Sequence, residues 1–233
     1  MTLFRAAVVA ATAVIAGAVG LLPMQNATAS PSNAVIIPAH DATVSGLSQV
    51  LDAVPPSGTT QVQFELTGGT LSDSVIATGT PTLFGWLALW NTTAVPNGSY
   101  ALQSVASHQG GVSATSPAIT IDVNNAPPST SVIIPTNGST LAGYGTLLFD
   151  ATASRGVSQV QFDITSTGFG TSFIATATLT IYGWIGTLSF SPCTAQCGTI
   201  PVPTTIQSVA SYPGGVSGTS QPVNVTYLDP NPG

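Results

Sequence analysis

Residues 61–66 read Gln-Val-Gln-Phe-Glu-Leu, and residues 159–164 read Gln-Val-Gln-Phe-Asp-Ile. Apolar and polar side chains alternate strictly in both stretches. Because successive side chains of a β-strand point to opposite faces, this period of two places Val62, Phe64 and Leu66 on one face, toward a core. The sequence therefore predicts the same half-buried strand in two copies.

Further matches between two halves of the chain follow in the same order. The paired segments are VIIP at 35–38 and 132–135, GW at 85–86 and 183–184, QSVAS at 103–107 and 207–211, and GGVS at 110–113 and 214–217. Matches in one order over so long a span indicate two homologous domains. We expect domain 1 over residues 32–125, a Pro-rich linker over 126–130 and domain 2 over 131–229.

Composition favours strands over helices in both copies. Hydrophobic residues make up 43% of the chain, and β-branched residues with Gly and Pro dominate, whereas lysine is absent. Such residues fit pleated strands and tight turns, so the predicted class is all-β. The only Lys or Arg residues are Arg5 and Arg155, and the net charge is −6. Nucleic acid is excluded as a partner because phosphate contacts need clustered Lys and Arg.

The first 29 residues have the pattern of a signal peptide. Met1 to Arg5 carries one positive charge, residues 6–22 are apolar or small, and Ala27-Thr28-Ala29 matches a small-residue cleavage site. We expect cleavage after Ala29; the alternative is an uncleaved membrane anchor, for which seventeen apolar residues are at the short limit. With cleavage the product has no membrane span and is secreted, in the extracellular space or associated with the cell wall.

A family resemblance accompanies the repeat. Residues 90–102, Trp-Asn-Thr-Thr-Ala-Val-Pro-Asn-Gly-Ser-Tyr-Ala-Leu, resemble the signature of bacterial immunoglobulin-like domains, and residues 36–46 resemble their first strand and turn. The resemblance implies two tandem immunoglobulin-like (or fibronectin-III-like) antiparallel β-sandwiches of about seven strands each. It also implies a role outside catalysis, because such domains serve as spacers, adhesin stalks and accessory modules of secreted enzymes. Repeat two departs from the signature at residues 190–198 and at Thr204, which stands where Tyr100 would be.

Cys193 and Cys197 are the only cysteines. An even count in an exported chain favours a disulfide between them, with free thiols as the alternative. The spacing is not that of a C-x-x-C redox or metal motif. We therefore expect no metal and no cofactor.

Candidate catalytic residues are few. His40 and His108 lie in different predicted turns, and no metalloprotease or nucleophile-elbow motif occurs. Asp52, Asp150, Glu65 and Asp163 fall on the polar phase of predicted strands, which faces solvent. Paired carboxylates in a cleft are the alternative. The sequence predicts no enzyme.

The segment that stands out is aromatic. In residues 83–90, Leu-Phe-Gly-Trp-Leu-Ala-Leu-Trp, both strand phases are apolar, and residues 181–185 keep this feature. A sandwich strand ordinarily buries one face, so the second is covered internally or forms an exposed patch for sugar stacking or protein contact. The candidate ligand patch comprises Phe84, Trp86, Trp90, Tyr182 and Trp184.

The function predicted from these observations is non-catalytic. We expect adhesion or a structural, protein-interaction role at the cell surface, with an extracellular protein or glycan as partner. The alternative is a carbohydrate- or cell-wall-binding protein that uses exposed aromatic side chains. A third class, a secreted enzyme, requires a polar cleft with converging carboxylates.

Overall fold

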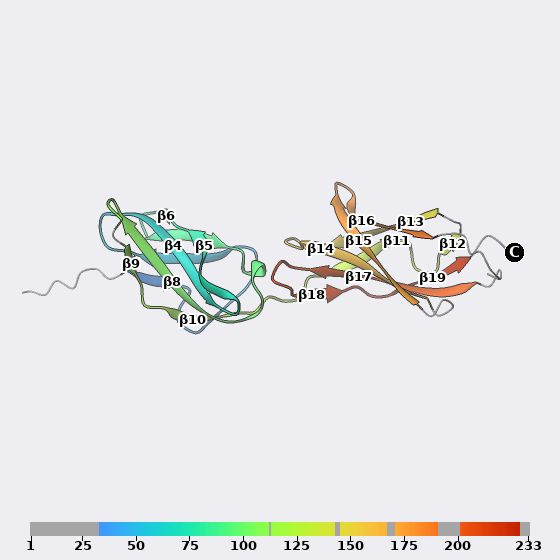
Figure 1. Ribbon diagram of the computed structural model, residues 1–233, viewed down its shortest axis with the longest axis horizontal. Helices are drawn as coiled ribbons and strands as arrows, with labels where there is room; N and C mark the ends of the chain where they lie inside the picture. The colour runs from blue at the N-terminus through green and yellow to red at the C-terminus, as the bar shows by residue number, and fades with distance from the viewer. Residues whose placement is uncertain (1–32, 112, 143–144, 167–170, 191–200, 229–233) are drawn as a thin grey trace, which may run out of the picture. The chain divides into compact units, whose positions relative to one another are not determined.

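The computed structural model describes residues 33–111, 113–142, 145–166, 171–190 and 201–228. Strands fill most of this part of the chain, and strands β1 to β10 pair only with one another, as do β11 to β19 (Figure 1). The predicted all-β class is confirmed: two tandem antiparallel sandwiches follow one another in the chain. The predicted signal peptide (residues 1–29) and both cysteines, Cys193 and Cys197, lie outside the described residues. In the described ranges no helix has the length and apolarity needed to cross a membrane.

Repeat one consists of two sheets. The first has the order β1-β3-β7-β6, with β1 at Ala34–Ile37, β3 at Gln49–Val54, β7 at Trp86–Trp90 and β6 at Thr80–Pro81. The second has the order β2-β10-β8-β4-β5, and β9 pairs with β8. Their bounds are Ala42–Val44 for β2, Ile119–Val123 for β10, Gly98–His108 for β8, Thr59–Gly68 for β4, Leu71–Thr78 for β5 and Ser113–Thr115 for β9. One short 3₁₀ turn, Thr92–Ala94, precedes β8.

The strands of repeat two correspond to those of repeat one and have the order β11-β13-β16-β15-β14-β17-β19-β12, with β18 paired to β17. Strand β15 pairs through residues 171–176 with β14 and through residues 177–180 with β16, so one strand belongs to both sheets. In repeat one, Gly79 interrupts the same path and separates β5 from β6. The bounds are Thr130–Ile134 for β11, Thr140–Ala142 for β12, Gly145–Ala153 for β13, Gln159–Ser166 for β14, Thr171–Thr180 for β15, Gly183–Phe190 for β16, Val202–Ser211 for β17, Ser217–Thr219 for β18 and Val223–Leu228 for β19.

The described part of the chain has ten strands in repeat one and nine in repeat two, more than the seven expected for each. One of the additional strands arises because the first strand of each repeat is split between the two sheets. The Ile37-Pro38 and Ile134-Pro135 peptide bonds, at the split, are cis. After it, β2 runs parallel to β10, and β12 runs parallel to β19, so each opening strand joins the edge of the second sheet. In immunoglobulin lettering the sheets of repeat one are A-B-E-D and A′-G-F-C-C′.

The predicted inward phases form the two cores. Val62, Phe64 and Leu66 are fully buried in repeat one. In repeat two, Phe162 packs against Phe149 with ring centroids 5.4 Å apart. The remaining members come from facing strands of the same repeat, so each sandwich has its own hydrophobic core.

A buried serine pair recurs in each core. The Ser104 N–H donates to Ser116 Oγ over 2.9 Å, and the Ser208 N–H donates to Ser220 Oγ over 3.0 Å. The outer partner differs: Ser104 Oγ donates to Asn33 Oδ1, whereas Ser208 Oγ shares a hydrogen bond with Thr130. These bonds satisfy polar groups that would otherwise be costly to bury.

Repeat one has the tyrosine anchor typical of the fold. Tyr100 is buried, and its hydroxyl donates to the carbonyl of Pro96 over 2.8 Å. Its ring lies against Gly68, where a Cβ would approach the ring to 2.9 Å. Burial raises the pKa of the Tyr100 phenol. In repeat two Thr204 occupies this position, as the sequence indicated, and it lines a small apolar cavity of about 20 Å³.

Candidate functional site

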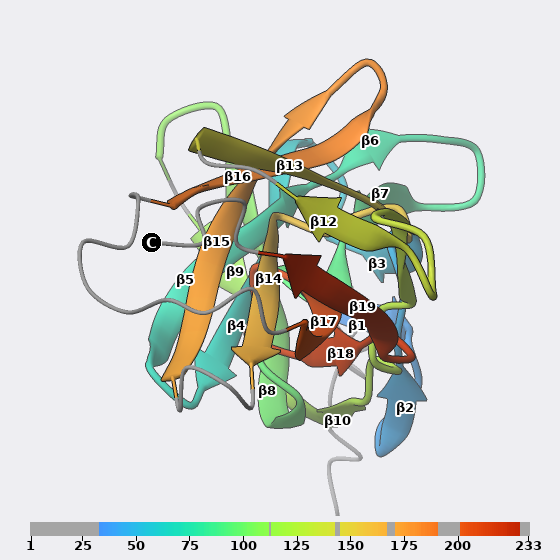
Figure 2. The same cartoon turned by 90° about the vertical axis from the view of Figure 1, so that its right-hand side faces the viewer.

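The most exposed apolar residues of both repeats lie on one repeated turn. In repeat one this turn joins β6 to β7, and in repeat two it joins β15 to β16. Figure 1 and Figure 2 show the β15–β16 hairpin, in orange, projecting from its sandwich. We call residues 82–85 and 180–183 the apolar turns.

A threonine side chain fixes the backbone of each apolar turn. Thr82 Oγ1 donates to the carbonyl of Gly85 over 2.8 Å and accepts from the N–H of Phe84 over 3.1 Å. Thr180 Oγ1 makes the same two bonds, to Gly183 and from Tyr182, over 2.9 and 3.1 Å. These two bonds fix the backbone between the threonine and the glycine, and the backbone in turn sets the direction of the two side chains between them.

Those two side chains are apolar and almost wholly in solvent. Leu83 and Phe84 are 99% and 83% exposed in repeat one. Their counterparts in repeat two, Ile181 and Tyr182, are 92% and 82% exposed. The two repeats therefore present the same chemistry, one aliphatic residue followed by one aromatic ring, at the same place in the fold.

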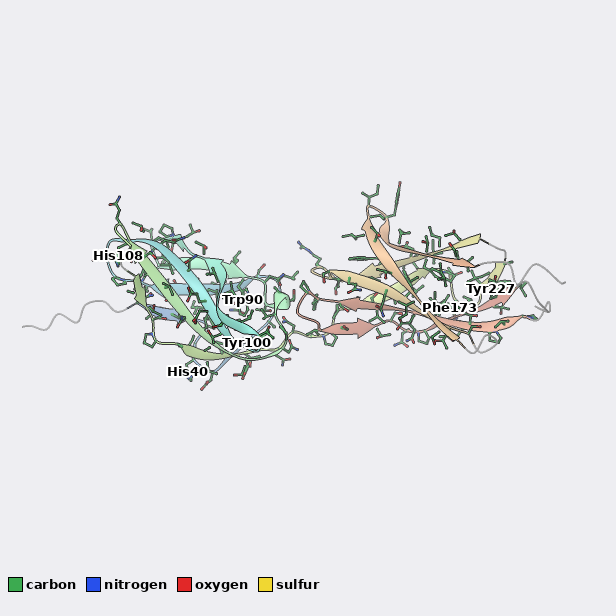
Figure 3. The ribbon with its side chains drawn as sticks, viewed as in Figure 1. His40, Trp90, Tyr100, His108, Phe173 and Tyr227 are labelled. Atoms are coloured by element: carbon green, nitrogen blue, oxygen red, sulfur yellow. The ribbon has the colours of Figure 1, made fainter. Side chains whose placement is uncertain are left out.

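The tryptophans do not belong to this exposed surface. Trp90 is 3% exposed and Trp184 is 9% exposed, whereas Trp86 is partly buried and packs against the core. In β7 the inward phase is Trp86, Ala88 and Trp90, and Figure 3 shows Trp90 within repeat one. The candidate ligand patch is corrected accordingly: Phe84 and Tyr182 are accessible, but Trp90 and Trp184 are not, because strand alternation turns them into the cores.

The outward phase of the first sheet also remains apolar. Leu89 on β7 is 67% exposed, and Val50, its pairing partner on β3, is 40% exposed. In repeat two Leu148 on β13 is 49% exposed. Leu89, in the segment 83–90, is therefore not covered by its own repeat.

Asp52 is not the solvent-facing carboxylate that its strand phase predicts. Its side chain is 7% exposed, and its Oδ1 is buried with no hydrogen-bond partner in the described structure. Asp150, its counterpart in repeat two, is half-buried, and its Oδ1 is likewise buried without a partner among the described residues. Each lies against the glycine of its apolar turn, Gly85 or Gly183, so the turn covers the carboxylate.

A groove of about 360 Å³ lies beside Phe84 in repeat one. One wall is the apolar turn, and the other is the β3–β4 connection, residues 54–59. Its lining residues are Val54, Pro55, Pro56, Ser57, Gly58, Thr59, Thr82, Leu83, Phe84, Gly85 and Trp86. None of these eleven carries a charge. The threonine turn and the Pro-Pro pair were missed by the sequence analysis, although the repeated Thr-x-aromatic-Gly pattern at 82–85 and 180–183 signals the turn.

Comparisons with known proteins bear on the fold alone. No protein-family model matches the chain, and no curated protein matches it. Matching solved structures include fibronectin(III)-like modules of Clostridium thermocellum CbhA, at 20% identity over 84% of this chain and 93% of that one, with a TM-score of 0.32. Rst D1-D2 matches at 8% identity over 84% and 99%, with a TM-score of 0.31. Protocadherin gammaB7 EC3-6 matches at 14% identity over 85% and 50%, with a TM-score of 0.25.

The fold is immunoglobulin-like. The assignment rests on the strand order of the sheets described above, because similarity at these identities and TM-scores identifies neither a family nor an activity.

Of the other candidate residues, His108 borders the groove, since its Nδ1 lies 3.8 Å from the Cβ position of Gly58, whereas the rest lie apart from the groove and from one another. Glu65 accepts a hydrogen bond from Gln103 over 3.0 Å on the outer face of the second sheet of the first Ig-like repeat. His40 contacts Asp41 over 2.9 Å in an exposed turn. Asp163 is bonded by Gln161 in the second repeat. Across the described ranges no group of three or more His, Cys, Asp or Glu side chains is arranged to hold a metal ion.

Proposed function

We propose that this chain is an exported, non-catalytic Ig-like protein with an adhesion or structural interaction role at the cell surface. In this proposal residues 1–29 are removed as a signal peptide, and the two sandwiches present their apolar turns to an extracellular partner. The observation that carries the proposal is the pair of outward apolar side chains at the same turn of both repeats, 82–99% exposed.

Exposing these four side chains costs free energy. Burying a Leu, Ile or Phe side chain contributes about 1.5–3 kcal/mol, so none of them stabilises the sandwich in its present position. A shared fold requires the threonine and the glycine of the turn, but it does not require Leu83-Phe84 or Ile181-Tyr182 between them. An exposed feature that two diverged repeats both keep is typical of an interaction surface.

Charge narrows the class of partner. Arg155 is the only Lys or Arg in the part of the chain that the structure describes, and the net charge of the whole chain is −6. Anionic polymers and anionic lipid surfaces are therefore poor partners, because they are attracted by clustered basic residues. An uncharged glycan or a protein surface with an apolar hollow fits the turns.

The proposal is tested with oxidised Ser30–Gly233 and purified cell-envelope fractions of the source organism. We expect retention on the envelope, and we expect it to fall when Leu83→Ser, Phe84→Ser, Ile181→Ser and Tyr182→Ser are combined. Val75→Ser is the matched control, because Val75 is 50% exposed on β5, in the other sheet. Unchanged retention of the quadruple variant contradicts a role for the apolar turns.

A second candidate function, carbohydrate or cell-wall binding, is favoured by the groove beside Phe84. Its chemistry is specific enough to name a ligand class.

A further inference from the structure

We propose that the groove of repeat one, between the β3–β4 connection and the apolar turn 82–85, is a binding site for an uncharged glycan chain, with the Phe84 ring as its stacking platform. This inference rests on the proposed function and names the partner of one of its two apolar turns.

The dimensions of the groove suit a small portion of a polymer. Its volume of about 360 Å³ lies at the lower end of the range for ligand pockets, roughly 300–1,000 Å³. It is an open groove on the surface and not an enclosed cavity, so a chain can enter and leave along it. Phe84 is 83% exposed, which leaves its ring available to a ligand.

The lining combines apolar surfaces with oxygen acceptors. Phe84, Trp86, Pro55 and Pro56 supply rings and methylene groups against which the C–H face of a sugar packs. The hydroxyls of Thr59 and Thr82 donate inward, to the carbonyls of Pro56 and Gly85, each over 2.8 Å. Both donors are thus used, and Thr82 Oγ1 also accepts from the Phe84 N–H, so the Thr59 oxygen keeps two acceptor sites and the Thr82 oxygen keeps one, to which sugar hydroxyls can donate.

The absence of charge in the lining selects against ionic ligands. Carboxylates, sulfates and phosphates are bound by Arg, Lys or clustered N–H groups, and none of the eleven lining residues is Arg or Lys. Neutral sugars need no ionic partner, because aromatic stacking and neutral hydrogen bonds bind them.

An extended peptide is a poorer fit than a glycan at this place. A peptide that adds to a sheet edge needs a row of unpaired backbone N–H and C=O groups. The edge strand beside the groove, β6, spans only Thr80–Pro81, and Pro81 has no N–H. The edge therefore offers little of the backbone ladder that strand addition uses.

Repeat two provides an internal control. It keeps the apolar turn, but Ala153, Ser154 and Arg155 occupy the positions of Pro55, Pro56 and Ser57. The proline wall is lost and a positive charge is introduced, so the glycan site is assigned to repeat one, and Tyr182 is the matched control for Phe84.

The experiment measures binding of oxidised Ser30–Gly233 to cellulose, chitin, β-mannan and starch, with alginate as a charged comparison. We expect retention on at least one of the four uncharged polymers and none on alginate. Phe84→Ser should weaken binding about tenfold or more, whereas Tyr182→Ser should leave it within about twofold. Both side chains are exposed, so neither change is expected to unfold the protein, and thermal unfolding of each variant checks this. Pro55→Ser/Pro56→Ser, on the opposite wall, should weaken binding independently.

Three outcomes overturn the inference: no retention on any uncharged polymer, stronger retention on alginate, or equal losses for Phe84→Ser and Tyr182→Ser. The envelope experiment separates this failure from failure of the proposed function. If the polymers do not bind but envelope retention still depends on the apolar turns and is lost after protease treatment of the envelope, the partner is a protein. The adhesion role then holds and the glycan site does not.

Discussion

The carboxylate Oδ1 of Asp52 occupies the space into which a side chain on Gly85 would extend. An ideal Cβ on Gly85 would also lie 3.1 Å from the carbonyl of Ala53, and the residue has φ of +149°. The same relationship holds in repeat two between Asp150 Oδ1 and Gly183, with a Cβ-to-Oδ1 distance of 2.5 Å and φ of +141°. In each repeat the glycine that ends the apolar turn is thus packed against a carboxylate whose Oδ1 is buried.

Replacing this glycine should destabilise the first repeat. We expect Gly85→Ala to lower the free energy of unfolding by about 1–3 kcal/mol, because it combines a strained backbone conformation with a collision against Asp52. Urea denaturation measures the change. Gly110→Ala is the control: its φ is +110° but nothing lies within 4 Å of its Cβ position, so it reports backbone strain without collision. If Gly85→Ala lowers the free energy of unfolding no more than Gly110→Ala does, the packing argument is contradicted.

The collision and the carboxylate should be energetically coupled. In an Asp52→Ala background, Gly85→Ala should cost less than in the unmodified protein, because Oδ1 is then absent. A double-mutant cycle by urea denaturation measures this difference, which is typically 0.5–3 kcal/mol for residues in contact. If the effects of the two substitutions on the free energy of unfolding are additive, the proposed contact between Asp52 and the Gly85 position is contradicted.

The outline of the fold was predictable from the sequence because it depends on local periodicity. Alternation placed Val62, Phe64 and Leu66 in the core. Asp52 was predicted wrongly because its burial comes from a turn thirty residues later in the chain. Trp90 was misplaced because both phases of β7 are apolar, so that periodicity alone does not say which phase faces inward.

The anchor formed by Tyr100 should respond to pH. Burial raises the pKa of its phenol, so in alkali the unfolded state loses this proton before the folded state does. The stabilisation that the neutral phenol gives is complete below about pH 10, the ordinary pKa of tyrosine, and is lost as pH rises through the folded-state pKa. Tyr100→Phe should therefore lower stability at neutral pH by about 1 kcal/mol, through loss of the bond to Pro96, and should reduce the decline above pH 10.

Urea midpoints from pH 7 to pH 11 test this behaviour. Tyr182→Phe is the control, since that ring lies on the apolar turn and is 82% exposed. The alkaline decline should persist in Tyr182→Phe and become shallower in Tyr100→Phe. Equal slopes in the two variants contradict the role given to the Tyr100 phenol.

Asn125 should be a stability determinant at the end of repeat one. It is 3% exposed, and its side-chain oxygen accepts from Gly46 N–H over 3.0 Å and from Thr92 Oγ1 over 2.6 Å. Its Nδ2 donates to the carbonyl of Thr92 over 3.0 Å. Asn125→Ala removes all three bonds and leaves the Gly46 N–H without its partner, although Thr92 Oγ1 keeps the Gly46 carbonyl and the Thr92 carbonyl keeps the Val95 N–H. We expect a loss of about 2–3 kcal/mol in chemical denaturation. Asn224→Ala is the control, because it removes one exposed hydrogen bond from Thr205 and should lower the free energy of unfolding by less than about 1 kcal/mol. Comparable losses for the two variants contradict the role given to Asn125.

Quenching of tryptophan fluorescence should distinguish the three tryptophans by their solvent exposure. Trp90 and Trp184 are shielded by their cores, whereas Trp86 is partly exposed at the groove. We expect iodide to quench only a minor part of the emission of the oxidised protein, and we expect Trp86→Phe to remove most of that quenchable part. Trp90→Phe should instead reduce the unquenched emission and destabilise repeat one, since a buried ring is replaced by a smaller one. If the quenchable fraction survives in Trp86→Phe, an indole other than Trp86 is accessible, and the groove is not the place where a ligand would change the fluorescence.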